Sequence, residues 1–261
     1  MILWQKRSDC PGIVWNEATQ LELLEQFSNK YRQEYQAFPQ TKPPGKPRFY
    51  FDNLAFGSVD AEILYGMVRS YRPSRLVEIG SGYSTLLAAE AFSKNLEEGH
   101  RGKLTAIEPF PRSFLKEELP FPIELLERPV QSVPLDVFSS LAANDILVID
   151  SSHVCKVGSD VQYEFLEILP RLAPGVIIHV HDIFFPAEYP KKWIKESHIF
   201  WNEQYLLQAF LSFNPAFEIL WGSNYMHINH PSKLANAFDS YRSERGGGGS
   251  FWIRRIDCPR Q

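Results

Sequence analysis

The sequence has few cysteines, no long hydrophobic run and no excess of basic charge, and each absence narrows its class. The cysteines Cys10, Cys155 and Cys258 lie far apart and form no CxxC pair. This spacing argues against a zinc site or a disulfide framework and suits a reducing compartment. No segment has the about 18 consecutive apolar residues of a membrane span, and the start lacks the apolar stretch of a secretory signal. We therefore expect a cytoplasmic protein with no membrane partner.

The charge and composition are those of an ordinary globular chain. The net charge is −4 over 261 residues, so the electrostatic footprint of nucleic-acid binding is missing. Hydrophobic residues make up 44% and charged residues 22%, which is typical of a packed domain. A helical pattern over Ala18–Tyr35 and a Pro-rich stretch up to Pro47 indicate that residues 1–48 form an N-terminal arm and linker. Residues 49–261 then form the main domain.

From residue 75 onward, apolar runs alternate with helix-forming segments. The expected strands are Leu76–Ile79, Lys103–Ile107, Ile123–Leu126, Asp145–Ile149, Val176–Val180, a bent strand made of Phe217–Trp221 and Tyr225–Ile228, and Ser250–Ile256. The expected helices are Val59–Tyr71, Ser84–Asn95, Val157–Leu172 and Trp201–Phe213, with shorter ones between. Such alternation predicts the α/β class, with a doubly wound, mostly parallel, seven-stranded sheet and helices on both faces.

The stretch Leu76–Ala89, which reads LVEIGSGYSTLLAA, organises the predicted fold. An apolar strand is followed by a Gly-x-Gly turn and then by an apolar helix. Gly80 and Gly82 let the backbone bend sharply and approach a ligand closely. The helix that begins near Ser84 directs free N–H groups toward the same place. Glu78 stands near the carboxyl end of the strand, where open α/β sheets bind ligands.

Acidic residues stand at or near the ends of four expected strands. They are Glu78, Glu108, Asp150 and Asp182. Because the carboxyl ends of parallel strands meet at one edge of a sheet, we expect these side chains to share one rim. Two histidine-containing segments join them there, Asp150-Ser-Ser-His153 and His179-Val-His181-Asp182.

These motifs resemble the class I S-adenosylmethionine (SAM)-dependent methyltransferases over about residues 55–256. VEIGSGYST is similar to the first motif of that family and AIEP to its second. The Gly82-Tyr83-Ser84 ending resembles the small-molecule O-methyltransferases of the catechol and macrolide-sugar type. The resemblance implies a Rossmann-like methyltransferase fold, SAM as cofactor, and Glu108 on the ribose hydroxyls. The residues implied to bind the cofactor are Glu78, Gly80, Ser81, Gly82, Tyr83, Ser84, Glu108 and Asp150.

A nicotinamide cofactor is the alternative ligand for this turn. A carboxylate that accepts hydrogen bonds from a ribose diol serves NAD as well as SAM. The NAD fingerprint, however, is Gly-x-Gly-x-x-Gly, and position 85 is Thr. We therefore favour SAM, mainly on the resemblance.

The resemblance also implies roles for the other end of the rim. Asp150 and Asp182 match the positions that hold a magnesium ion in catechol-type methyltransferases, and His181 falls where a carboxylate is more usual. The expected metal ligands are Asp150, His181 and Asp182. A nitrogen ligand suits iron, manganese or zinc better than magnesium, and the absence of any metal is also left open. His153 is the candidate general base, or else a cap of the following helix. The candidate catalytic residues are therefore His153, Asp150, Asp182 and His181.

Four further groups of residues are interpreted from their own patterns. Phe184–Trp201 is either a lid, with Phe185, Tyr189, Trp193 and Trp201 as pocket walls, or a surface insertion. Asn224, Tyr225 and His227 are weaker candidates for the pocket. His179 is interpreted as a structural histidine, and Gly246–Ser250 as a natural flexible loop.

The sequence thus favours a SAM-dependent methyltransferase that acts on a hydroxyl of a small molecule such as a sugar, a polyketide or a phenol. One alternative is a metal-dependent oxygenase on the same scaffold, since cephalosporin-hydroxylase-like proteins share this fold and its motifs. Another is a non-catalytic SAM-binding protein. Homo-oligomerisation is left open.

Overall fold

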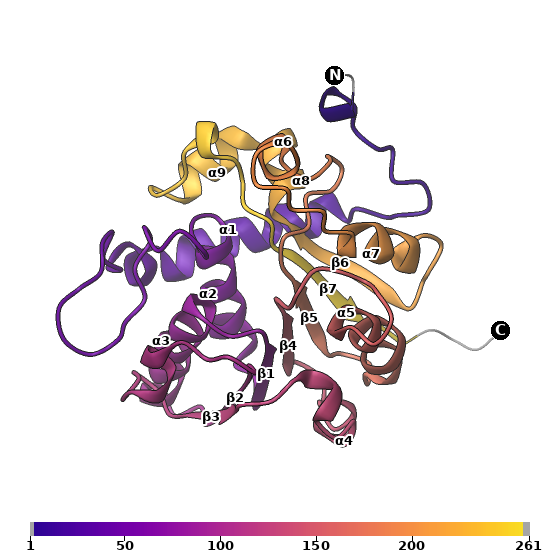
Figure 1. The fold of residues 1–261 in the computed structure, drawn as a ribbon. Helices are drawn as coiled ribbons and strands as arrows, with labels where there is room; N and C mark the ends of the chain where they lie inside the picture. The colour runs from indigo at the N-terminus through magenta and orange to yellow at the C-terminus, as the bar shows by residue number, and fades with distance from the viewer. Residues whose placement is uncertain (1–2, 258–261) are drawn as a thin grey trace.

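A computed structural model of the chain describes residues 3–257, and Cys258 lies outside this range (Figure 1). The strands are β1 Arg75–Ile79, β2 Lys103–Ile107, β3 Ile123–Leu126, β4 Ile146–Ile149, β5 Ile177–Val180, β6 Phe217–Gly222 and β7 Phe251–Arg255. The α-helices are α1 Glu17–Gln36, α2 Asp60–Tyr71, α3 Tyr83–Glu97, α4 Asp136–Ser139, α5 Asp160–Tyr163, α6 Lys191–Lys195, α7 Glu203–Leu211, α8 Ser223–Asn229 and α9 Pro231–Ala237. Short 3₁₀ turns occupy Leu3–Gln5, Ser113–Lys116, Val130–Ser132, Leu169–Arg171 and Ser243–Arg245.

All seven strands lie in one sheet, in the order β3-β2-β1-β4-β5-β7-β6. Strands β1 to β5 pair in parallel, and β7 runs antiparallel to both β5 and β6. The strand order reverses beside β1, so β1 and β4 are the point where a doubly wound sheet opens to a ligand. The predicted fold class is confirmed.

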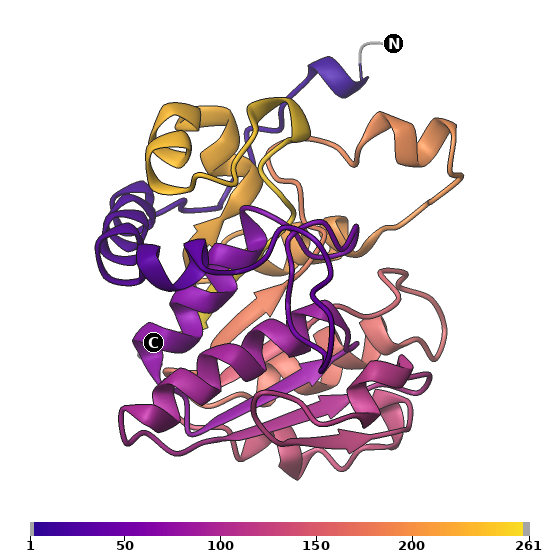
Figure 2. The ribbon, with the colours of Figure 1, turned by 90° about the vertical axis from the view of Figure 1, so that its left-hand side faces the viewer.

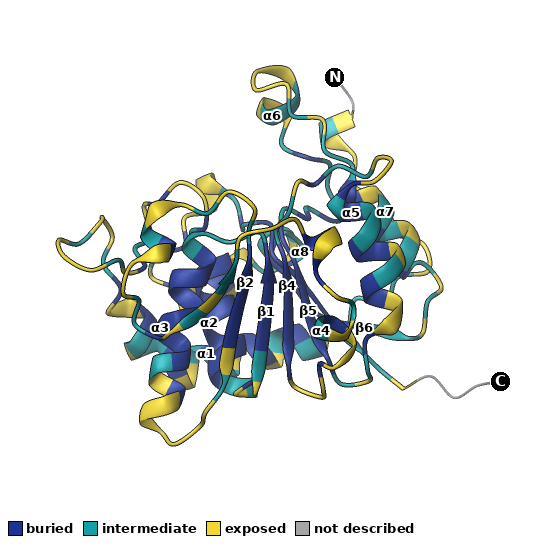
Figure 3. Ribbon diagram, turned by 60° about the horizontal axis from the view of Figure 1, so that its bottom comes forward, coloured by how far each residue is buried: buried dark blue, intermediate teal, exposed yellow. Residues whose placement is uncertain are grey.

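Helices cover both faces of the sheet, and each face has its own hydrophobic core (Figure 2). Alternate residues of one strand serve opposite faces because successive side chains point to opposite sides. Leu76 of β1, for example, packs with α2 and α3 residues, whereas Val77 packs in the core that includes Phe165 and Leu207. Figure 3 shows the central strands buried between exposed outer helix surfaces. The burial of both faces explains the nearly continuous apolar runs of the sequence.

The N-terminal arm contributes to the larger core. Leu24, Phe27, Tyr31 and Tyr35 of α1 are buried in the same cluster as α2 and α3. Helix α1 contacts α2, α9 and strand β6. The helical spacing of its apolar residues is thus explained by a face that the main domain covers.

The prediction that Tyr225–Ile228 continues the sixth strand is wrong. These residues form α8, which begins directly after β6 ends at Gly222. Met226 points into the core, while Tyr225 stacks on Trp15 with ring centroids 4.2 Å apart. A four-residue apolar segment does not distinguish the helical from the extended period.

The helix expected at Val157–Leu172 begins later and is irregular. It runs as α5, then as a π-helical segment Glu164–Ile168, and then as the 3₁₀ turn Leu169–Arg171. Pro170 has no N–H to donate, which accounts for the end of the regular hydrogen-bond pattern. No helix within residues 3–257 has the length and apolar character needed to cross a membrane.

Candidate functional site

The turn between β1 and α3 is shaped by two glycines with different surroundings. Gly80 has a φ of +78°, and a Cβ added there would lie 1.8 Å from the carbonyl oxygen of Asp150. Only glycine therefore permits β1 and β4 to approach so closely at their carboxyl ends. At Gly82, by contrast, an added Cβ would meet no atom within 4 Å among the described residues. The backbone of the turn thus borders open space at Gly82.

Glu78 lies beneath this turn and supports it. Its side chain is buried, and Thr85 donates a hydrogen bond from its hydroxyl to the carboxylate. The Thr85 hydroxyl in turn accepts a hydrogen bond from the backbone N–H of Gly82 at 3.0 Å. Burial raises the pKa of Glu78 to about 7, although hydrogen bonds from Ser84 and Thr85 oppose the rise. Thr85, which replaces the third glycine of an NAD fingerprint, therefore ties the turn to the strand.

Glu108 follows β2 and faces the same turn. Its carboxylate accepts hydrogen bonds from the backbone N–H of Ser81 at 3.2 Å and of Phe110 at 2.8 Å. The hydroxyl oxygen of Ser81 is buried and has no hydrogen-bond partner within residues 3–257. These groups offer a ligand one oriented carboxylate and one free hydroxyl.

The next two predicted cofactor residues lie at the start of α3. Tyr83 is half-buried, its hydroxyl is 3.0 Å from that of Tyr50, and its ring packs on Phe114. Ser84 is buried beneath the turn. Their contact with a cofactor stays a prediction.

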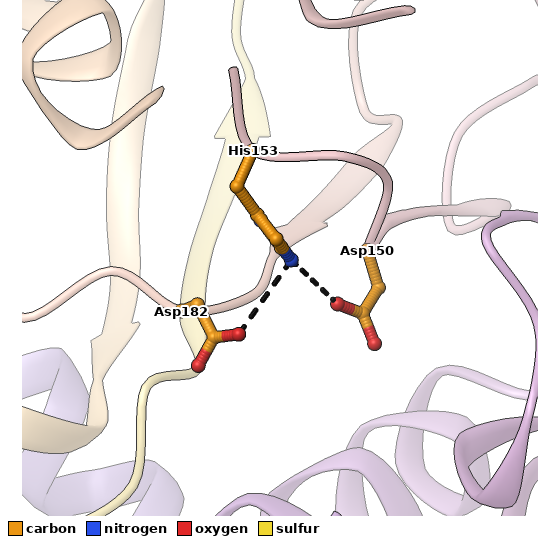
Figure 4. A group of neighbouring side chains, drawn as sticks. All are labelled: Asp150, His153 and Asp182. Atoms are coloured by element: carbon orange, nitrogen blue, oxygen red, sulfur yellow. Dashed lines mark ion pairs between the residues drawn. The ribbon is translucent and has the colours of Figure 1, made fainter. Parts of the chain in front are cut away.

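Two aspartates and two histidines meet at the ends of β4 and β5, which are neighbouring parallel strands. Nε2 of His153 lies 3.4 Å from Oδ1 of Asp150 and 3.6 Å from Oδ2 of Asp182 (Figure 4). Nδ1 of His181 lies 3.3 Å and 3.6 Å from the same two oxygens. We call these four residues the rim cluster. One nitrogen of each imidazole therefore faces the aspartate pair.

The other nitrogen of each imidazole contacts a buried carboxylate from a distant element. Nδ1 of His153 lies 2.8 Å from Oε2 of Glu203, the first residue of α7. Nε2 of His181 lies 3.2 Å from Oδ2 of Asp60, the first residue of α2. The same arrangement of carboxylate and histidine orients metal ligands and general bases in many proteins.

The charges of the rim cluster depend on one another. Burial lowers the pKa of His153, but hydrogen bonds with Asp150 and Glu203 outweigh it and raise the value to about 10. Burial also opposes a charge on His181, yet Asp150 and Asp182 lift its pKa well above the usual range. Burial would raise the pKa of Asp150, but His181 and His153 hold it well below its usual range. The pKa of the more distant Asp182 is raised by burial. The two aspartates and the two imidazoles thus stabilise one another's charged forms.

A cavity of about 770 Å³ adjoins the rim cluster. His181 and Asp182 contribute to its wall, together with the loop that precedes α2, the segment before and within α6, helix α8 and the glycine-rich segment 246–249. Phe184, Trp193, Asn224 and His227 also line it. A small organic molecule bound there would contact the rim cluster directly.

The lid candidate divides into buried and exposed parts. Trp193 lines the cavity, but Phe185 and Tyr189 are core residues and form no wall. Phe185 packs against Phe251, which explains its burial. Trp201 instead packs on the His153 ring, with centroids 4.2 Å apart. Helix α6 stands out from the body of the molecule beside the N-terminal turn (Figure 3).

The glycine-rich segment is packed against the site, contrary to its interpretation as a flexible loop. The backbone N–H groups of Gly249 and Ser250 donate to the Asp60 carboxylate at 2.8 Å and 2.9 Å. A Cβ added at Gly248 would lie 2.3 Å from Oδ1 of the same carboxylate. The glycines therefore allow the backbone to enclose Asp60, which contacts His181.

Sequence reasoning missed Asp60 and Glu203. Both stand at the start of amphipathic helices, where an acid is ordinary because it complements the helix dipole. No local spacing connects either residue with the histidine that it contacts. His179 agrees with its structural interpretation, because it is buried, stacks on Trp252 and contacts the Ser250 hydroxyl.

The strand order and the glycine-rich turn at the end of β1 define the class of α/β proteins with a Rossmann-like methyltransferase fold. Residues 77–183 match the family model described as a methyltransferase domain. This match spans less than half of the chain and, over these residues, bears out the predicted resemblance to class I SAM-dependent methyltransferases.

One curated relative is an uncharacterized protein of Archaeoglobus fulgidus, 34% identical over 138 residues. The match covers 52% of this chain and 61% of that protein, so the chain spans less than two thirds of its relative. The chain is also similar to an O-methyltransferase from Bacillus cereus in complex with SAH, at a TM-score of 0.42 and 13% identity, covering 92% and 91% of the two chains. An apo-structure of CmcI gives a TM-score of 0.41 at 13% identity, covering 78% and 73%. At these TM-scores, neither likeness carries an argument about activity.

Proposed function

We propose that the chain transfers the methyl group of SAM to a hydroxyl of a small molecule. The observation that carries this proposal is the position of Asp150 between two sites. Its carbonyl oxygen packs against Gly80 of the turn, and its carboxylate contacts His153 and His181 of the rim cluster. His181 also lines the large cavity. A methyl donor at the turn and an acceptor in the cavity would therefore meet at Asp150.

The residues around the turn fit SAM. Two backbone N–H groups hold Glu108 as an oriented carboxylate, which suits the two hydroxyls of a ribose. The backbone borders open space at Gly82, and the buried Ser81 hydroxyl awaits a partner. Glu78 supports the turn from beneath. These contacts support the proposal that the segment Glu78–Ser84, together with Glu108, forms the cofactor site.

The rim cluster supplies the proton chemistry. Methyl transfer is an in-line displacement, so the chain has mainly to align the acceptor oxygen and exclude water. The hydroxyl proton must also leave, and we assign Nε2 of His153, in the neutral form of its ring, to accept it. A cation bound to Asp150 and Asp182 would favour that form, because it would neutralise the carboxylates that now face Nε2. The cavity of about 770 Å³ is large enough for a sugar, a phenol or a polyketide ring.

The same cluster fits a divalent cation. The ligand atoms of Asp150, His153 and Asp182 lie within 4.8 Å of one another, and Nδ1 of His181 is close to the same oxygens. We propose Asp150, His181 and Asp182 as the ligands, which leaves His153 as the base. A bound cation would hold the acceptor oxygen and favour its ionised form. The mixture of oxygen and nitrogen ligands suits manganese or iron better than magnesium.

Calorimetric titration of SAM into the full chain tests the cofactor assignment. We expect Glu108→Ala to weaken SAM binding at least about tenfold, because it removes a charged hydrogen-bond acceptor. Glu127→Ala is the matched control, since Glu127 is exposed and pairs with Lys116. Equal SAM affinity in wild type and Glu108→Ala, or no SAM binding by the wild type, would overturn the proposal. SAM binding without transfer to any hydroxyl compound would instead favour a non-catalytic SAM-binding protein.

A further inference from the structure

We propose that Glu203 is a positioning residue for His153. Its carboxylate holds Nδ1 in a hydrogen bond, so that Nε2 points toward Asp150 and Asp182. Oε2 of Glu203 lies 2.8 Å from Nδ1 of His153, and both side chains are buried. An ionised carboxylate can only accept, so Nδ1 is the donor in this contact when Glu203 is ionised, and Nε2 is the nitrogen left to face Asp150 and Asp182. The two residues are 50 positions apart in the sequence.

The start of α7 holds the backbone of His153 as well as its ring. The N–H groups of Asn202 and Glu203 both donate to the His153 carbonyl oxygen, at 3.1 Å and 3.3 Å. The ring of Trp201 packs on the imidazole. His153 itself has a φ of +60°, a conformation that a non-glycine residue adopts only when its surroundings impose it. Three consecutive residues, 201–203, thus determine where His153 lies.

The partnership also gives the buried Glu203 carboxylate a counter-charge. Burying a lone carboxylate is costly, whereas a contact with an imidazolium offsets that cost. The other oxygen, Oε1, has no hydrogen-bond partner within residues 3–257. Glu164 is a second buried acid nearby, and burial and the charge of Glu203 raise its pKa well above the usual range. It accepts a hydrogen bond from Ser151, and no hydrogen bond among the described residues joins it to His153. Glu203 is therefore the acid that faces the ring.

Residues 201–203 lie outside the segment 77–183 that matches the methyltransferase-domain model. They belong to the end of the lid candidate and the first turn of α7. The contact has a catalytic consequence only if the proposed function holds, because Nε2 would then face the acceptor. The hydrogen bond itself does not rest on it.

Nuclear magnetic resonance of the full chain, with ¹⁵N in the histidine rings, tests the proposal. The resonances of His153 are assigned by their loss in His153→Asn. We expect the wild type to show a His153 Nδ1 proton far downfield, as a hydrogen bond to a buried carboxylate requires. Glu203→Gln should shift that proton upfield, because a neutral amide accepts more weakly. Glu167→Gln, the control at a part-exposed acid that pairs with Arg171, should leave the resonance in place.

Three results would overturn the proposal. They are an unprotonated Nδ1 in the wild type, an unchanged resonance in Glu203→Gln, or an equal shift in both glutamine variants. If Glu203→Gln does not fold, Glu203→Asp retains the charge but withdraws it by one methylene, and the same upfield shift is expected. Failure of SAM binding in calorimetry would overturn the proposed function and leave this result untouched.

Discussion

The two halves of the candidate site are built in different ways. The cofactor half comes from one turn and the end of the next strand, from Glu78 to Glu108, and these hydrogen bonds join residues 3 to 27 positions apart. The acceptor half gathers Asp60, residues 150–182, Glu203 and the glycine-rich segment near Gly248. The cofactor half therefore depends on local backbone conformation, whereas the acceptor half depends on the correct assembly of the whole fold.

The two halves also differ in their charges. In the cofactor half, backbone N–H groups orient the single carboxylate of Glu108. In the acceptor half, buried carboxylates and imidazoles compensate one another, so that the pKa of each group depends on its neighbours. Apart from Asp150, which borders both halves, substitutions in the acceptor half should therefore change proton and metal chemistry while leaving SAM affinity alone.

The substitution His153→Ala should separate the halves most strongly. We expect the rate of methyl transfer to fall by about 10²–10⁴-fold, the usual contribution of a general base. SAM affinity should stay at the wild-type value, because His153 does not contact the turn residues. The measurement combines transfer of labelled methyl from SAM to a panel of phenols and sugars with SAM calorimetry. A wild-type transfer rate would end the role of His153 as the base.

Glu62 is a buried acid outside both halves, and the substitution Glu62→Gln tests whether its side chain is neutral in the folded chain. Burial raises the pKa of Glu62 to about 7 from 4.5, although hydrogen bonds from Ser240 and Ser58 oppose the rise. A raised folded-state pKa contributes stability below pH 4.5 that is lost as the pH rises through 7. The variant should thus match the wild type near pH 4.5 and exceed its stability at pH 8 by on the order of 3 kcal/mol.

Urea unfolding at the two pH values measures this difference in stability. Glu25→Gln on the exposed face of α1 is the control and should show no such pH dependence. A pH-independent difference between Glu62→Gln and wild type would show that Glu62 is charged in the folded chain. Glu62, which has no basic partner among the described residues, would then resemble Asp150 of the rim cluster, whose charge the histidines stabilise.

The cofactor half could be predicted from the sequence because its residues are adjacent in the chain. The Gly-x-Gly turn and the acid after the second strand have fixed places relative to their own strands. The sheet likewise followed from apolar runs. The rim aspartates were foreseen because strand ends in a parallel sheet share an edge. Asp60, Glu203 and the packing of Gly248 could not be foreseen, since contacts across 50 or more residues leave no local pattern.

Manganese binding tests the metal part of the acceptor half. We expect Asp182→Asn to weaken Mn²⁺ binding by more than about tenfold, because it removes a charged ligand. SAM affinity should not change, which would show that the metal ligand acts independently of the cofactor half. Electron paramagnetic resonance of free Mn²⁺ gives the affinity. A wild-type chain that leaves all Mn²⁺ free would remove the metal role, whereas Mn²⁺ binding without SAM binding would favour the metal-dependent oxygenase.

The pair Gly248→Ala and Gly246→Ala measures how closely the acceptor half is packed. Both residues have positive φ, +84° and +88°, a region that alanine rarely adopts, so backbone strain costs about 1–3 kcal/mol in each variant. Only at Gly248 would the new Cβ also meet the Asp60 carboxylate, since nothing lies within 4 Å of it at Gly246 among the described residues. The collision would disturb the hydrogen bonds that Asp60 accepts from Gly249 and Ser250. Each is worth about 1 kcal/mol, so Gly248→Ala should be less stable than Gly246→Ala by about 1 kcal/mol if one bond is lost and about 2 kcal/mol if both are. Equal stability of the two variants in urea unfolding would mean that the segment is free to move away from Asp60. The backbone of the acceptor half could then shift to accommodate a side chain, whereas the turn at Gly80 in the cofactor half could not.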